Sequence, residues 1–286
     1  MKIWRQATGA IKDKFSLIAA ADDKLTAEII KATSHNDPSM DIENVQFIYR
    51  YIQCNPSSFK PIIRAISSRV ESTRSWTVAL KSLMLIHGLF LAGHPTVESI
   101  GRLPFDLSGF GKTNSRFSKT GRFSIFIRAY FAFLDGRSVL FFNDGNRPNN
   151  EIVIRLETIA EMQRIVDSLM RIKPIGETME TPLVIEAMGY VISEIMEIYG
   201  RICRGFDDFL SDFLQSRSGK PEAELAKKIV AKSSSQGEEV FKYFEFCRVL
   251  GIANDREIPY FLRVSESDVV VLDSVAGGNG GEGFGD

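Results

Sequence analysis

The stretch WTVALKSLMLIHGLFLA, residues 76–92, is apolar on nearly every side of a helix. A helix that is hydrophobic all round is enclosed by other helices. Its most apolar part, residues 83–92, includes His87 and is about half as long as a membrane span requires. We therefore predict that residues 76–92 form a central helix of a globular domain, and that Trp76 is buried with the apolar side chains Leu80, Leu83, Ile86 and Phe90.

Apolar residues at helical spacing also dominate the sequence on both sides of this helix. The expected helices cover residues 2–15, 23–33, 42–54, 61–70, 123–142, 151–172, 182–215, 221–233 and 237–251. Residues 102–120 have the composition of a loop, and the one strand-like run, residues 269–272, has no partner. The sequence predicts an all-α fold of about ten helices in a curved stack: residues 1–265 form the helical domain, and residues 266–286 form an acidic, glycine-rich flexible tail.

Composition excludes several classes of protein. The net charge is -1, so the whole chain has no general attraction to nucleic acid. Three widely spaced cysteines, Cys54, Cys203 and Cys247, favour buried thiols in a reducing compartment over a disulfide framework. The first residues, MKIWRQATGAIKDKF, have no apolar core of a secretory signal. We expect a cytoplasmic protein.

The sequence contains no complete catalytic pattern. Residues 109–113, GFGKT, resemble the end of a P-loop, but Asp106 occupies the position that requires a glycine. His87 is interpreted as a hydrogen-bonded core histidine, and metal-ligand spacings are missing. The sequence therefore predicts a protein that is not an enzyme and binds no cofactor or metal, with solvated helix faces for the acids Glu194, Glu197, Asp207 and Asp208.

Local basic charge is the remaining functional signal. Residues 1–14 carry four basic residues and one acid, which gives a charge of +3. Residues 102–128 carry six basic residues and one acid, which gives a charge of +5. Each exposed basic side chain near an anionic leaflet contributes about 1 kcal/mol. The predicted membrane-facing residues are Lys2, Arg5, Lys12, Lys14, Arg116, Lys119 and Arg122. The alternative is that Ile3, Ile11 and Phe15 dock the first helix onto the fold and these charges are ordinary surface charges.

Three ordered motifs resemble the ANTH domain of clathrin assembly proteins, in particular its short plant members. They are KATSH at residues 31–35, SWTVALKSLMLIH at residues 75–87 and FIRAY at residues 126–130, and the resemblance runs from about residue 5 to about residue 260. It implies a right-handed stack of about ten helices in an endocytic adaptor of clathrin-coated pits, coated vesicles and the Golgi. It also implies phosphoinositide binding, with Lys31 touching the inositol phosphates, and SNARE cargo in some members.

The sequence departs from this family in two places. Where the family has a lysine-rich run after the histidine, residues 41–44 read Asp-Ile-Glu-Asn. Reversing two charges changes the balance by four units, about 4 kcal/mol, so the headgroup pocket is expected to be weakened. No NPF, DPF or DPW tripeptide and no clathrin box occurs, although the family normally carries a long tail with such motifs. The predicted function is an adaptor that binds phosphoinositide membranes weakly and trafficking proteins. The alternative is a helical scaffold that binds only SNARE-type or coat proteins.

Overall fold

The computed structural model describes residues 10–14, 16–17, 23–35, 38–93, 95–112, 118–146, 152–216, 219–252, 262 and 264–277. Within these residues it is built from α-helices and two short 3-10 turns, and it has no strand. Residues 10–14 and 16–17 are helical and precede the labelled helices. The labelled helices are α2 (Lys24–Ala32), α3 (Ile42–Cys54), α4 (Phe59–Glu71), α5 (Trp76–Leu91), α6 (Pro95–Glu98), α7 (Lys119–Asn146), α8 (Ile152–Met170), α9 (Pro182–Ser216), α10 (Lys220–Val249) and α11 (Glu266–Gly277).

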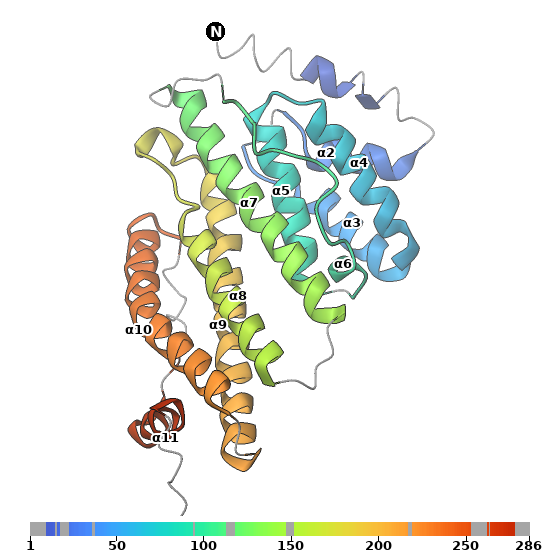
Figure 1. Cartoon of the computed structure of the whole chain (residues 1–286). Helices are drawn as coiled ribbons and strands as arrows, with labels where there is room; N and C mark the ends of the chain where they lie inside the picture. Colours follow the sequence, from blue (N-terminus) through green and yellow to red (C-terminus); the bar gives the residue numbers. More distant parts are fainter. Residues whose placement is uncertain are drawn as a thin grey trace, which may run out of the picture.

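Successive helices pack against one another along the molecule (Figure 1). The first layer contains α2, α3 and α4, and α5 leads from it to α7 and α9. The pairs α7–α8, α8–α9 and α8–α10 continue the stack, and α11 lies against α10 at the far end. The predicted all-α class with about ten helices is confirmed.

Helix α5 forms the centre of the first half of the stack, as predicted. Every residue from Val78 to Phe90 is buried, including the polar Lys81 and His87. Trp76, at the start of α5, is only half-buried and stacks on Phe123 with 3.9 Å between ring centroids. The prediction for the helix is correct, but that of a buried Trp76 is not, because Trp76 is the first residue of α5 and lies at the edge of the core.

Two helices near the C-terminal end differ from the predicted elements. Helix α10 is continuous where the sequence suggested a break between residues 233 and 237, and Gly237 is buried within it. The strand-like run 269–272 lies inside α11. Ser265 begins this helix: its Oγ accepts a hydrogen bond from the Asp268 backbone N at 3.1 Å and donates one to the Asp268 carboxylate at 2.6 Å. Ser265 thus caps the helix, and residues 266–277 of the expected flexible tail are helical.

The three cysteines are free, but they are not all buried. Cys247 is buried and Cys203 is half-buried, whereas Cys54 is exposed at the last turn of α3. The prediction of buried thiols is therefore wrong for Cys54, because α3 ends there at the surface before Asn55 and Pro56.

Candidate functional site

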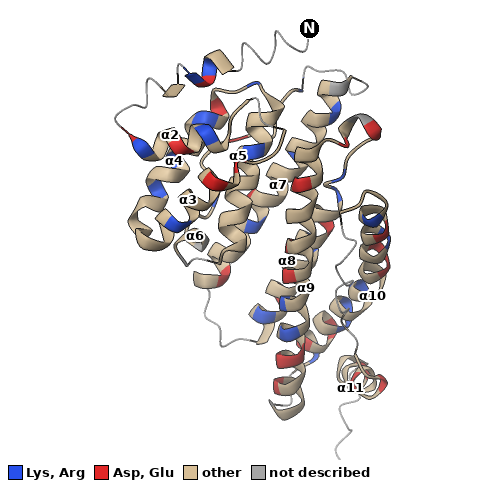
Figure 2. Cartoon of the chain, turned by 180° about the vertical axis from the view of Figure 1, so that it is seen from behind, with Lys and Arg blue, Asp and Glu red and all other residues tan. Residues whose placement is uncertain are grey.

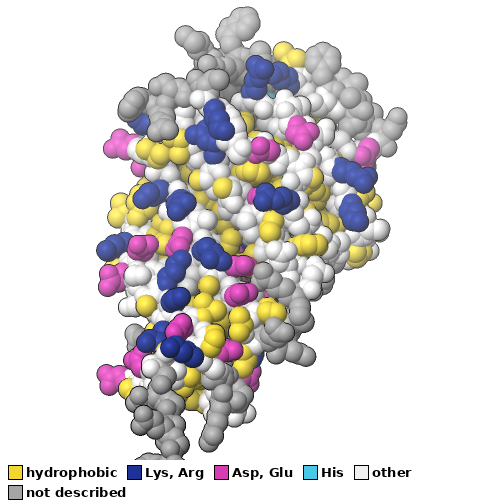
Figure 3. Space-filling view, in the orientation of Figure 1, with side chains coloured by type: hydrophobic (Ala, Val, Ile, Leu, Met, Phe, Trp, Pro, Cys, Tyr) yellow, Lys and Arg dark blue, Asp and Glu magenta, His cyan; other side chains and the backbone are white. Residues whose placement is uncertain are grey.

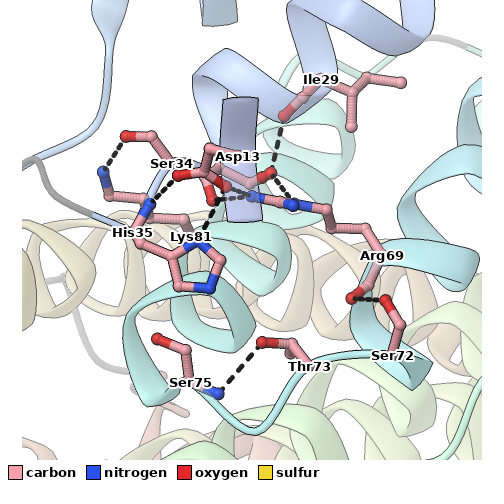
Figure 4. Close-up of polar contacts among 10 residues, drawn as sticks. Asp13, Ile29, Ser34, His35, Arg69, Ser72, Thr73, Ser75 and Lys81 are labelled. Carbon is pink, nitrogen blue, oxygen red and sulfur yellow. Dashed lines mark hydrogen bonds and ion pairs between the residues drawn. The ribbon is translucent and has the colours of Figure 1, made fainter. Parts of the chain in front are cut away.

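Asp13 is the centre of a charged cluster (Figure 4). Its carboxylate accepts a hydrogen bond from the His35 backbone N at 2.8 Å and pairs with His35 Nδ1 at 2.7 Å and Arg69 Nη2 at 2.5 Å. His35 follows α2, and Arg69 lies in the last turn of α4. The carboxylate therefore joins the N-terminal helical segment to two helices, and we call Asp13, His35, Arg69 and Thr33 the Asp13 centre.

The second half of the KATSH motif builds this cluster. Thr33 is fully buried, and its hydroxyl donates to the Ile29 carbonyl at 2.7 Å. Arg69 Nε donates to the Thr33 hydroxyl at 3.1 Å, and Arg69 Nη2 donates to the Thr33 carbonyl at 3.1 Å. The motif thus closes the C-terminal end of α2 and orients the guanidinium toward Asp13. In this chain Thr33 and His35 have a structural role.

The environment of Asp13 keeps its carboxylate ionised. Burial alone raises the pKa of Asp13, but the hydrogen bonds from His35 and the hydrogen bond and charge of Arg69 outweigh burial and lower the pKa to about 2. A carboxylate with this pKa is negative at every physiological pH. The docking of the helical segment around Asp13 therefore depends on charge.

Lys81 brings the second family motif to the same place. It comes from α5, is fully buried, and its Nζ donates to the Ser34 hydroxyl at 3.4 Å. A buried ammonium requires polar partners because its desolvation is costly. The Lys81 side chain therefore contributes to the packing under the KATSH turn (Figure 4) and is not available to an external anion.

Lys31, the residue matched to the family's phosphate contact, is accessible. Its side chain is 46% exposed and its Nζ pairs with Glu28 at 3.0 Å. Asp41, at one of the expected lysine positions, begins α3 and accepts hydrogen bonds from the Asn44 backbone N at 3.2 Å and Asn44 Nδ2 at 2.6 Å. Glu43 is exposed in the first turn of α3. The acid at position 41 thus caps a helix, a contribution of about 1 kcal/mol.

The structure describes only some of the predicted membrane-facing residues. Lys12 and Lys14 are exposed on either side of Asp13. Arg122 is partly buried on α7, and its Nη1 lies 3.2 Å from the position that a Cβ would have on Gly176. Lys119 begins α7, but its side chain lies outside the described residues, as do Lys2, Arg5 and Arg116. The start of α7 and residues 10–17 lie at the same end of the molecule (Figures 1 and 2).

A second charged cluster lies in the core and was missed by the sequence analysis. Glu194 is fully buried: it pairs with Arg137 Nε at 2.5 Å and with His87 Nε2 at 3.2 Å. His87 Nδ1 bonds the Tyr130 hydroxyl at 2.7 Å. The prediction of a solvated face for Glu194 is wrong, because α5 and α7 supply its partners from distant parts of the sequence. The interpretation of His87 as a hydrogen-bonded core histidine is confirmed.

Burial and charge act in opposite directions within this core cluster, which we call the His87 centre. Burial raises the pKa of Glu194, but the hydrogen bond from His87 and the charge of Arg137 outweigh it, so the pKa lies below its usual value. Burial lowers the pKa of His87 against the influence of Glu194. All three side chains are at most 2% exposed. The cluster therefore holds α5, α7 and α9 together and has no route to a substrate.

The described residues offer no other chemical centre. They contain no group of three His, Cys, Asp or Glu side chains placed to hold a metal ion. In the P-loop-like segment, Asp106 accepts a hydrogen bond from the Ser108 backbone N at 2.7 Å, which closes a tight turn. None of the helices in this part of the chain is both long and apolar enough to cross a bilayer.

Comparison with known proteins identifies the fold and the family. The family model of the ANTH domain matches residues 24–276, which include the KATSH turn, α5 and all but the last residue of α11. The chain belongs to the ANTH domain family. Proteins of this family that resemble it are named for clathrin assembly and not for a reaction, in agreement with the prediction that the chain is not an enzyme.

Three Arabidopsis thaliana relatives of this ANTH domain, each named "Putative clathrin assembly protein", are 66%, 58% and 41% identical to it over 96%, 96% and 97% of the chain. The alignments cover 86%, 82% and 77% of those relatives. A solved structure, the ENTH domain from epsin-2 in complex with phosphatidylinositol 4,5-bisphosphate, matches with a TM-score of 0.57 at 18% identity, covering 85% of this chain and 98% of that one. This structural likeness establishes the shared fold of stacked helices.

Proposed function

We propose that this ANTH domain protein is a clathrin assembly protein: a non-catalytic endocytic adaptor that associates with anionic, phosphoinositide-containing membranes and binds trafficking proteins. The observation that carries the proposal is the 66% identity, over 96% of the chain, to a relative with the clathrin assembly name. The expected places of action are the cytoplasmic face of clathrin-coated pits, coated vesicles and the Golgi. The expected partners are coat proteins, adaptors and SNAREs.

The lipid contact in this proposal is weak. Lys31 is accessible and offers one positive charge, but Glu28 pairs with it, and the nearby positions 41 and 43 carry acids. Each unit of charge near the membrane contributes about 1 kcal/mol. Replacing two lysines by two acids changes the charge by four units and so removes about 4 kcal/mol of attraction to a headgroup. This is close to a thousandfold in affinity. The basic residues of the N-terminal segment, Lys2, Arg5, Lys12 and Lys14, and of residues 116–122, Arg116, Lys119 and Arg122, then add to the remaining attraction.

Flotation of the purified chain with liposomes tests this proposal. Vesicles of neutral lipid, of neutral lipid with phosphatidylserine, and of the latter with phosphatidylinositol 4,5-bisphosphate form the three arms. We expect no binding in the first arm and salt-sensitive binding in the others, because screening by salt weakens exposed charges. In parallel, clathrin triskelia should sediment as assembled coats at lower concentration when the protein is present. Failure in both assays would overturn the proposal.

A second candidate is a scaffold that binds only SNARE-type or coat proteins and has no specific lipid binding. The observation that favours it is the groove on the outer face of α3, about 490 Å³ in volume, lined by Glu43, Gln46, Phe47, Arg50, Tyr51, Cys54 and Asn55. Phe47 and Tyr51 lie along it with ring centroids 5.9 Å apart. An apolar helical groove suits a partner helix. Absence of flotation in all three arms, together with capture of purified coat or SNARE segments, would favour this candidate.

A further inference from the structure

The N-terminal helical segment, described at residues 10–14 and 16–17, turns an acid and not its isoleucine toward the domain. Its acid, Asp13, is buried against the domain, while its large apolar residue Ile11 is 53% exposed. Lys12 and Lys14 are exposed beside Ile11. Of the residues Ile3, Ile11 and Phe15 in the alternative docking prediction, Ile11 does not dock, and Ile3 and Phe15 lie outside the described residues. Ile11 is therefore an exposed apolar side chain beside two cations.

Helix α4 presents a second row of cations next to this segment. Its apolar residues Ile62, Ile63, Ile66 and Val70 are buried, so its opposite face is exposed. Lys60 and Arg64 are exposed on that face four residues apart, and Arg74 is exposed just beyond the helix. Figure 3 shows Lys and Arg side chains over α4, on the right of the view. The ion pair between Arg69 and Asp13 connects α4 directly to residues 10–17.

The charge balance of this region is strongly positive. Lys12, Lys14, Lys60, Arg64 and Arg74 make no ion pair within the described part of the chain, and we call these five residues the α4 basic surface. Glu71 is the exposed acid on the same helix, so five positive charges and one negative leave +4; Arg69 and Asp13 cancel. By contrast, Lys31 with the acids Glu28, Asp41 and Glu43 leaves one minus three, or -2.

We propose that the α4 basic surface, with Ile11 at its edge, is the face on which this protein contacts an anionic bilayer. The inference rests on the proposed membrane association and names the surface that performs it. Unpaired cations attract anionic headgroups, and an exposed isoleucine among them suits the boundary between headgroups and acyl chains. An acidic protein or nucleic acid would account for the cations but leaves Ile11 without a role. The contact recognises headgroup charge and needs no pocket for a single inositol phosphate.

Paired charge reversals test the location of this surface. The variant Lys60→Glu/Arg64→Glu changes the net charge from -1 to -5, and the control Lys228→Glu/Lys242→Glu on α10 makes the same change at exposed positions far along the stack. On phosphatidylserine vesicles we expect the α4 variant to lose at least about tenfold in affinity and the α10 control to stay within about twofold of the parent. Melting curves should match for all three proteins, because the substituted side chains are exposed.

A graded pair of variants keeps the test independent of a folding defect. Lys60→Gln/Arg64→Gln should lose less affinity than the double glutamate variant, and Ile11→Ala should weaken binding without changing its dependence on salt. If the parent floats and the α4 variant floats equally well, the inference is overturned while the proposed function stands. If the parent protein does not float with any of the anionic vesicles, the proposed membrane association fails, and the inference fails with it. If the α4 variant lost binding to a polyanion such as heparin but kept its binding to vesicles, the inference would also be overturned.

Discussion

The Asp13 centre and the His87 centre use the same three kinds of side chain for different purposes. Each has one carboxylate between a histidine and an arginine: Asp13 with His35 and Arg69, and Glu194 with His87 and Arg137. The Glu194 side chain is fully buried, whereas that of Asp13 is 12% exposed at the rim. The inner cluster fixes the arrangement of three long helices, and the outer one fastens a short segment. The position of such a cluster in the fold therefore decides whether it stabilises the whole domain or only the docking of one terminal segment.

The largest expected effect comes from breaking the inner cluster. Glu194→Ala leaves Arg137 buried without its carboxylate, which should lower the free energy of unfolding by about 3–5 kcal/mol. Denaturant titration measures this change. Glu197→Ala, on the exposed side of the same helix, is the matched control and should cost less than about 1 kcal/mol. Equal effects of the two variants would mean that Glu194 is not part of a buried pair.

A second prediction concerns the close packing of Gly88, the residue after His87. A Cβ on Gly88 would lie 1.7 Å from Tyr49 Oη and 2.7 Å from Tyr49 Cζ. Gly88→Ala should therefore destabilise by about 1–3 kcal/mol through overpacking. Adding Tyr49→Phe should recover part of the loss, since it removes the nearer atom. Gly189→Ala, where nothing lies within 4 Å, is the control and should not destabilise. Unchanged stability of Gly88→Ala would contradict this close approach of α3 and α5.

Breaking the outer cluster should release one segment and leave the domain folded. The pKa of Asp13 falls from 3.8 to about 2, a difference of about 2 kcal/mol in favour of docking at neutral pH. Because the folded pKa is lowered, this stabilisation is present above about pH 4 and disappears as the pH falls through about 2. Asp13→Asn should show the same loss at neutral pH. Hydrogen exchange should become faster in residues 10–17 while protection of α5 is kept; Asp207→Asn, at an exposed position, should change neither.

The smallest expected effect on stability lies beside the outer cluster. Asp41→Lys/Glu43→Lys removes the cap of α3 and should cost about 1 kcal/mol. The same variant should bind phosphoinositide vesicles at least about tenfold more tightly, with a steep dependence on salt. Asp41→Asn/Glu43→Gln, which keeps a capping side chain, separates the two effects. Unaltered lipid binding in the double lysine variant would show that the headgroup pocket has changed in shape as well as in charge.

Much of the fold was predictable from helical spacing, because α5, α8 and α9 each carry an uninterrupted apolar pattern. The continuous α10 was not predicted, since its middle section is polar and contains Gly237. In the fold this section packs against α8, where Gln163 Nε2 donates to the Ser233 hydroxyl and Gln236 Nε2 donates to the Gln163 carbonyl. Helix α11 could have been found from Ser265 and Asp268, whose spacing is that of a capping box. Val269, Val270 and Val271 instead suggested a strand, because β-branched side chains favour strands.

The site was less accessible to sequence reasoning than the fold. The family motif singles out Lys31, Asp41 and Glu43, whose role in lipid binding stays a prediction, but the partnership of Asp13, His35 and Arg69 joins residues 22 and 56 positions apart. No local pattern indicates such contacts. The same reason explains Glu194, which meets His87 across 107 positions. The chain's charge pattern identifies basic residues, but only the packing of helices shows which of them share a surface.

The unequal exposure of the three cysteines has a consequence for spectroscopy. Thiols react with maleimides as thiolates, and burial raises the pKa of Cys203 and raises that of Cys247 to about 12. Cys54 is the exposed thiol of the three, and it lines the groove on α3 with Phe47 and Tyr51. The unaltered chain therefore carries one fast-reacting attachment point. A fluorophore placed there would sense the polarity of whatever enters the groove.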